Sequence, residues 1–239
     1  VTVCCAEGAE GHVYPGTIPF EIEYMDSALV PKTNTEIMLT VGDPGRAFAL
    51  SAIPNAGVGL ARTEFIINNS IGIHPMALVR YPKLGDPEAV KKIAERIGGE
   101  DPREFFLRRF SEGVGRIAAA FYPRPVIVRT SDFKTNEYAE LLGGREFEPK
   151  EENPMLGFRG ASRYYDPRYA EGFALECAAL LRVRKEMGLT NVKVMIPFCR
   201  TIEEGKKVLK LMEENGLKKG DLEIYVMCEI PSNVILADQ

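Results

Sequence analysis

The chain carries the run Arg129-Thr130-Ser131-Asp132-Phe133-Lys134-Thr135-Asn136-Glu137-Tyr138 directly after the apolar stretch Val126-Ile127-Val128. The short β-branched stretch predicts a buried strand. The run that follows is dense in charged and amide side chains. Because burying charged groups without partners is costly, these groups are expected to face a cleft, a metal or an anion. The two stretches together predict a functional site at the end of a strand.

The same arrangement recurs at two other places. Gly59-Leu60-Ala61-Arg62-Thr63-Glu64 ends an earlier apolar run, and Val226-Met227-Cys228-Glu229 ends a later one. Charged residues at the ends of several strands suggest one shared active site. Its arginines are Arg62, Arg129 and Arg159, each at or just after the end of an expected strand. Planar guanidinium groups match carboxylate and phosphate oxygens bidentately, so the three predict a polyanion site. The alternative for each arginine is a structural ion pair.

Glu229 is the candidate metal ligand. A carboxylate at such a site can hold Mg²⁺, which prefers oxygen ligands and usually takes one or two carboxylates together with substrate oxygens. The alternative is that Glu229 pairs with one of the arginines. Since one carboxylate makes a weak metal site, a second is expected on strands that would follow residue 239.

Strand-like and helix-like stretches alternate from residue 36 onward, which predicts right-handed βαβ units and a parallel sheet. Six such units suggest an α/β fold, a TIM-type (β/α)₈ barrel that lacks its last two units; a complete barrel takes about 250 residues. A doubly wound sheet is the alternative, but no Gly-rich phosphate loop follows the first strand. The strands are expected at 37–41, 58–61, 126–128, 158–160, 192–196 and 224–228.

Three segments are expected along the chain. Residues 1–24 predict the last hairpin of a small β-rich domain, with a Gly-rich turn at 7–11 and an alternating stretch at 20–24. Residues 25–35 are polar and predict a linker, and residues 36–239 form the incomplete barrel. The chain begins at Val1 and enters a strand-like stretch at once, so it is expected to be part of a longer polypeptide.

The composition is that of an ordinary soluble globular protein, with 45% hydrophobic and 27% charged residues and a net charge of −4. It has no basic block, so no nucleic-acid partner is expected. Its apolar runs fall far short of the ~20 residues of a membrane span, so no membrane association is expected. A cytoplasmic location is predicted. A single Gln among abundant Lys, Arg and Glu leans toward a thermophilic source.

Four stretches together resemble the C-terminal part of the phosphoenolpyruvate synthase (pyruvate, water dikinase) group of PEP-utilizing enzymes, and the resemblance covers nearly the whole chain. The relatives pyruvate phosphate dikinase and enzyme I of the sugar phosphotransferase system share the Arg-Thr-Glu and Arg-x-x-Asp elements. They lack the stretch from Asn136 through Arg159. The four stretches are 57–66, 129–138, 151–160 and 227–233.

The resemblance implies a gluconeogenic transferase that makes phosphoenolpyruvate, AMP and phosphate from pyruvate, ATP and water. In that family, a phosphohistidine on a swivelling domain of the same polypeptide phosphorylates pyruvate in the barrel. Residues 1–24 would end the swivelling domain. Arg62 and Arg129 would bind phosphoryl and enolate oxygens, Arg159 would be a further anion contact, and Glu229 would ligate Mg²⁺. A homodimer or larger homo-oligomer is also implied.

Several parts of that family's machinery have no match within residues 1–239. The phosphorylated histidine would lie upstream, and the second metal carboxylate and the proton-delivering cysteine downstream. The chain alone is therefore not expected to catalyse the full reaction. Two alternatives stay open: a related barrel phosphotransferase whose phosphoryl donor is another protein, and a non-catalytic module in which the barrel mainly builds an oligomer.

Overall fold

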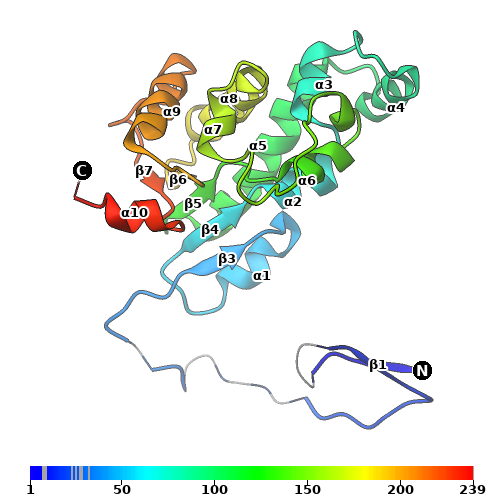
Figure 1. The fold of residues 1–239 in the computed structure, drawn as a ribbon. Helices are drawn as coiled ribbons and strands as arrows, with labels where there is room; N and C mark the ends of the chain where they lie inside the picture. Colours follow the sequence, from blue (N-terminus) through cyan, green and yellow to red (C-terminus); the bar gives the residue numbers. More distant parts are fainter. Residues whose placement is uncertain (7–9, 23, 25, 27–28, 32, 239) are drawn as a thin grey trace. The chain divides into compact units, whose positions relative to one another are not determined.

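The computed structural model describes residues 1–6, 10–22, 24, 26, 29–31 and 33–238 (Figure 1). The chain divides into two compact units, Val1–Asn34 and Thr35–Gln239. None of the helices in these described residues is both long enough and apolar enough to cross a membrane.

The first unit contains a hairpin of β1 (Thr2–Cys4) and β2 (His12–Tyr14), which pair antiparallel. The predicted hairpin is therefore present, although residues 7–9 of its turn lie outside the described residues. The alternating stretch at 20–24 is irregular over residues 20–22, where Phe20 and Ile22 are exposed. Alternation stabilises a strand only where one face is buried. The predicted linker at 25–35 is described only in part, without residues 25, 27–28 and 32.

The second unit is built on a parallel sheet whose strands follow one another in chain order. This unreversed order differs from a doubly wound sheet, where the order reverses at a switch point. In the described part of the chain, the first and last strands are free edges, so the sheet is open and does not close into a barrel. The strands are β3 (Leu39–Val41), β4 (Val58–Arg62), β5 (Val126–Arg129), β6 (Val192–Ile196) and β7 (Ile224–Val226).

The sheet has five parallel strands instead of the six expected, because the predicted strand at Phe158-Arg159-Gly160 is wrong. Strands β5 and β6 hydrogen-bond directly to each other, which leaves no place for a strand between them. The segment turns instead: Gly160 has φ +58° and ψ −140°, and the Phe158 amide donates to the Glu151 carboxylate at 2.9 Å.

Three of the longer helices of the second unit begin at capping residues. The side chains of Asp86, Asp101 and Thr201 accept hydrogen bonds from amides in the first turns of α4, α5 and α9. The helices are α1 (Ala47–Ser51), α2 (Glu64–Ile66), α3 (Pro75–Arg80), α4 (Pro87–Ile97), α5 (Pro102–Phe121), α6 (Thr135–Glu140), α7 (Ala161–Tyr164), α8 (Ala170–Lys185), α9 (Ile202–Glu214) and α10 (Pro231–Ile235), with short turns of other helix types at Pro44–Arg46, Ile67–Ile71 and Gly144–Glu146.

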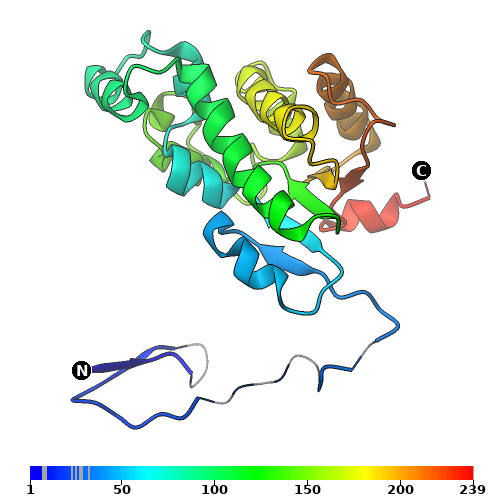
Figure 2. The same ribbon diagram turned by 180° about the vertical axis from the view of Figure 1, so that it is seen from behind.

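Helices α5, α8 and α9 lie side by side on one face of the sheet (Figure 2). The side chains of β6 that point toward this face, Val192, Val194 and Ile196, are buried, whereas Lys193 and Met195 between them are half-buried. One face of the sheet is thus packed as a core and the other is only partly covered. The carboxyl ends of the strands carry the charged groups predicted from the sequence.

Candidate functional site

A cavity of about 510 Å³ opens at the carboxyl ends of β4 and β5. Arg62 and Arg129 reach it from these two strand ends, and Arg159 reaches it from the loop before α7. The three arginines predicted from the sequence therefore line one cavity, whereas Glu229 is not among its lining residues. The lining comprises Arg62, Glu64, Phe65, Asn68, Arg129, Asp132, Phe133, Lys134, Glu137, Glu140, Met155 and Arg159.

Two carboxylates alternate with the arginines. Arg129 Nη2 lies 3.0 Å from Glu64 Oε1, and Arg129 Nη1 lies 3.3 Å from Asp132 Oδ2. Arg159 makes a bidentate ion pair with Asp132: its Nε donates to Oδ1 at 3.1 Å and its Nη2 donates to Oδ2 at 2.8 Å. Burial works against the charge of Arg129, but Glu64 and Asp132 outweigh it and raise the Arg129 pKa. The guanidinium therefore stays charged and fixed in place.

Glu64 and Asp132 are the carboxylates paired with Arg62, Arg129 and Arg159, so this group of five has one more positive than negative charge, whereas the whole lining, with Lys134, Glu137 and Glu140, is balanced. Arg62 is the most accessible member, with 44% of its side chain exposed, and its Nε lies 3.8 Å from Glu64 Oε2. Arg129 Nε and Glu64 Oε2 are buried without a hydrogen-bond partner among the described residues. Buried polar atoms of native proteins are usually paired, so this donor and this acceptor are available to a ligand.

The backbone that carries the cluster is held on several sides. Thr63 Oγ1 donates to the Arg129 carbonyl at 3.0 Å, and the Asp132 amide donates to Glu64 Oε1 at 2.7 Å. The Ser131 carbonyl accepts a hydrogen bond from the Tyr164 hydroxyl at 2.8 Å. The loop after β5 is thus fixed before any ligand binds, which is how a site avoids reorganising during a reaction.

Glu176 on α8 supports the same loop from the core side. It is fully buried; its Oε2 accepts the Ser131 amide at 3.0 Å and its Oε1 accepts the Ser131 hydroxyl. The Ser131 hydroxyl is also 2.6 Å from Tyr138 Oη, which in turn lies 2.7 Å from Tyr169 Oη. Burial raises the pKa of Glu176 to about 7. The loop therefore rests on a buried carboxyl group that titrates near neutral pH.

A second buried network holds the loop that carries Arg159. Arg163 makes a bidentate ion pair with Glu148, in which Nη1 and Nη2 each lie 2.6 Å from a carboxylate oxygen. Its guanidinium packs over the rings of Tyr138 and Phe158. Glu148 Oε1 also lies 3.0 Å from His74 Nε2, while His74 Nδ1 accepts the Met76 amide. Burial lowers the His74 pKa. A neutral ring with Nε2 protonated satisfies both contacts, so His74 has a structural role.

Glu229 follows β7 and lies next to the end of β6. Its Oε1 accepts the Phe198 amide at 2.6 Å, and its own amide donates to Asn233 Oδ1 at 3.3 Å. Within the described residues, no three His, Cys, Asp or Glu side chains are arranged to hold a metal. The chain therefore offers one carboxylate here, which fits an ion shared with substrate oxygens and water and does not fit an all-protein metal cage.

Sequence reasoning assigned no roles to Glu64, Asp132 and Glu176. The first two stand inside the quoted strand-end stretches, two and three residues after an arginine, so their signal was a carboxylate beside a predicted anion site. For Glu176 the signal was a carboxylate next to Cys177, on a helix face otherwise occupied by Phe173 and Leu180. A charged residue on an apolar face needs a partner inside the core.

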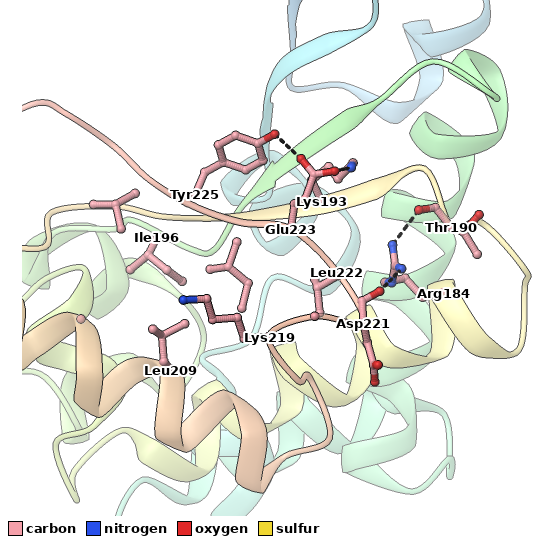
Figure 3. A pocket seen from close by; sticks show the side chains of 14 residues that line it. Arg184, Thr190, Lys193, Ile196, Leu209, Lys219, Asp221, Leu222, Glu223 and Tyr225 are labelled. Atoms are coloured by element: carbon pink, nitrogen blue, oxygen red, sulfur yellow. Dashed lines mark hydrogen bonds and ion pairs between the residues drawn. The ribbon is translucent and has the colours of Figure 1, made fainter.

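A larger hollow of about 610 Å³ lies away from this site, along the free edge of β7 beside α9 (Figure 3). Several of its polar groups contact one another. Lys193 pairs with Glu223, which also accepts the Tyr225 hydroxyl at 2.5 Å, and Arg184 donates to the carbonyls of Thr190 and Asp221. Lys219 lines the hollow as well, and none of the predicted site residues does.

Comparison with known proteins shows which family the chain resembles. A family model described as "PEP-utilising enzyme, PEP-binding domain" matches residues 21–239. The chain is 59% identical to a phosphoenolpyruvate synthase of Synechocystis sp., 56% to one of Helicobacter pylori and 51% to one of Escherichia coli. Each comparison covers 100% of this chain and 30% of the relative, so the chain spans about a third of the length of these curated proteins.

Proposed function

Because the chain belongs to the PEP-utilising enzymes and matches their PEP-binding domain, we propose that it is the pyruvate- and phosphoenolpyruvate-binding part of a phosphoenolpyruvate synthase. The whole enzyme would convert ATP, pyruvate and water to AMP, phosphoenolpyruvate and phosphate. The proposal rests on one observation above all: Arg62, Arg129 and Arg159 converge on one cavity at the carboxyl ends of neighbouring strands.

The arginines would bind the anionic groups of the substrate. Arg129 would contact the migrating phosphoryl group and the enolate oxygen through the in-plane N–H groups of its guanidinium, of which Nε has no hydrogen-bond partner among the described residues. Arg62, which is the most exposed, would close on the ligand from the cavity mouth. Arg159 would hold a further oxygen. Phosphoryl transfer needs mainly positioning and neutralisation of charge, and arginines held by Glu64 and Asp132 supply both without rearranging.

Glu229 would hold Mg²⁺ through the carboxylate oxygen that does not accept the Phe198 amide. When bound, the ion would polarise substrate oxygens and stabilise the negative charge of the enolate. The protein's own part is to fix the carboxylate: the Phe198 amide orients Oε1, and Asn233 holds the backbone of Glu229. A second carboxylate would come from elsewhere in the whole enzyme.

The phosphoryl donor would be a phosphohistidine of the same polypeptide. His74 is fully buried with both ring nitrogens engaged, so it is unsuited to that role. The open mouth beside the exposed Arg62 would admit the donor. The assignment of residues 1–24 to the end of the donor's domain, homo-oligomerisation, a cytoplasmic location and a thermophilic source stay predictions.

The test is an assay of the intact protein with ATP and pyruvate. We expect pyruvate-dependent formation of AMP, phosphoenolpyruvate and phosphate in the absence of added phosphate. A strict requirement for phosphate would favour a dikinase of the pyruvate phosphate type, and transfer to another protein would favour an enzyme I type. No turnover of pyruvate at all would favour a non-catalytic module.

A further inference from the structure

Phe198 follows β6 and has a backbone conformation that a phenylalanine rarely adopts. Its φ is +49°, the only positive φ of a non-glycine residue in the described part of the chain. A bulky residue in this left-handed region is strained, and such strain persists only where the surroundings enforce it. Strained residues concentrate at functional sites.

The ring of Phe198 contacts two guanidinium groups. The Cζ atoms of Arg159 and Arg200 are each 4.6 Å from its centroid. Arg159 is the arginine that grips Asp132 in the cavity. Arg200 donates to the carbonyls of Leu156 and Gly157, in the loop directly before Arg159. The ring is 8% exposed, so these cation–π contacts are largely shielded from water.

The backbone amide of Phe198 contacts the candidate metal ligand Glu229. It donates to Glu229 Oε1 at 2.6 Å. The turn is also pressed against Gly160: a Cβ added there would lie 2.5 Å from Phe198 Cβ and 2.6 Å from the Pro197 carbonyl oxygen. One strained residue therefore contacts the loop of Arg159 through its ring and the carboxylate of Glu229 through its amide.

We propose that Phe198 is a positioning residue that couples the arginine cluster to Glu229. The ring fixes Arg159, and the two guanidiniums in turn hold the backbone in the left-handed conformation that aims the amide at Glu229. Replacing the ring by an aliphatic side chain removes the π face, which releases Arg159 and lets the turn relax away from Glu229. The inference rests on the proposed function for the identity of the anion and the metal.

The experiment compares intact wild-type enzyme with Phe198→Leu. Mn²⁺ binding, followed by electron paramagnetic resonance of the free ion, measures the metal site without turnover; a Glu229→Gln variant identifies the ions that depend on Glu229. The KM for pyruvate measures the anion site. Phe105→Leu is the matched control, since Phe105 is buried and also lies beside an arginine, 5.7 Å from Arg109 Cζ on α5.

We expect Phe198→Leu to weaken Glu229-dependent Mn²⁺ binding and to raise the KM for pyruvate, each about tenfold. Phe105→Leu should lower only the melting temperature. A folded Phe198→Leu enzyme with both values within about twofold of wild type would overturn the proposal, as would wild-type enzyme without Glu229-dependent Mn²⁺ binding. If Phe198→Leu does not fold, Phe198→Met decides by the same criteria. Failure of the proposed function is distinct, because it shows as wild-type enzyme that makes no AMP from pyruvate.

Discussion

The buried carboxyl group of Glu176 makes a prediction about stability that depends on pH. Its pKa is raised from 4.5 to about 7 in the folded protein, mainly by burial. A carboxyl group whose pKa is raised on folding binds its proton more tightly in the folded state. Its contribution to stability is therefore complete below about pH 4.5 and is lost as the pH rises through 7. The Glu176→Gln variant removes this dependence, because its amide cannot ionise.

The magnitude follows from the two pKa values. The difference between about 7 and 4.5, at about 1.4 kcal/mol for each pKa unit, amounts to about 3 kcal/mol at high pH. Part of this free-energy contribution is already lost at pH 5. Between pH 5 and pH 8, the free energy of unfolding of the variant should therefore rise by about 2 kcal/mol relative to wild type. This corresponds to a factor of about 30 in amide exchange rate.

Hydrogen exchange measured by mass spectrometry on peptides that contain β5 provides the assay, since it reports on this unit within the intact enzyme. Variant and wild type are compared at the same pH, so that the chemical exchange rate cancels. Glu171→Gln on the same helix is the control, because Glu171 is exposed and pairs with Arg80 and Arg103 at the surface. If the Gln variant is more stable than wild type by the same amount at pH 5 and pH 8, or is no more stable at either pH, the raised pKa of Glu176 is contradicted.

Three further predictions follow from the same contacts. Arg129→Met in the intact enzyme should lower pyruvate phosphorylation about 10²–10³-fold by removing a donor from the transition state, whereas Arg103→Met on the surface of α5 should not. Asp132→Asn should destabilise the protein by about 3 kcal/mol in thermal unfolding, because it leaves the buried Arg159 without its two-armed partner; unchanged stability would contradict that role. Gly160→Ala should cost about 1–3 kcal/mol, since the new methyl group meets Phe198 Cβ and φ is +58°, and a melting temperature equal to wild type would show that the turn is not tight.

Arg62 and Arg129 could be predicted as strand-end residues because the sequence marks them locally. The stretch Val126–Val128 is β-branched and is followed at once by charged residues, so both the strand and the position of Arg129 follow from the pattern. The caps at Asp86 and Asp101, each followed by proline, likewise place the starts of α4 and α5.

Long-range partners carry no such local mark. Glu64 and Asp132 neutralise the arginines because β4 and β5 are neighbours in the sheet, which brings residues 68 positions apart into contact. The strand expected at Phe158–Gly160 failed for a related reason. The residue types of this stretch fit a short strand, but β5 pairs directly with β6 and leaves no place for a strand between them. A short apolar run does not by itself specify which strands it pairs with.

The most direct test of the anion site is a crystal structure of the intact enzyme with phosphoenolpyruvate. We expect the phosphate to lie in the cavity at the ends of β4 and β5, within hydrogen-bond distance of the Arg129 guanidinium and of Arg62 or Arg159. Ligand bound elsewhere, for example along the free edge of β7, with the arginine and carboxylate pairs undisturbed, would contradict it.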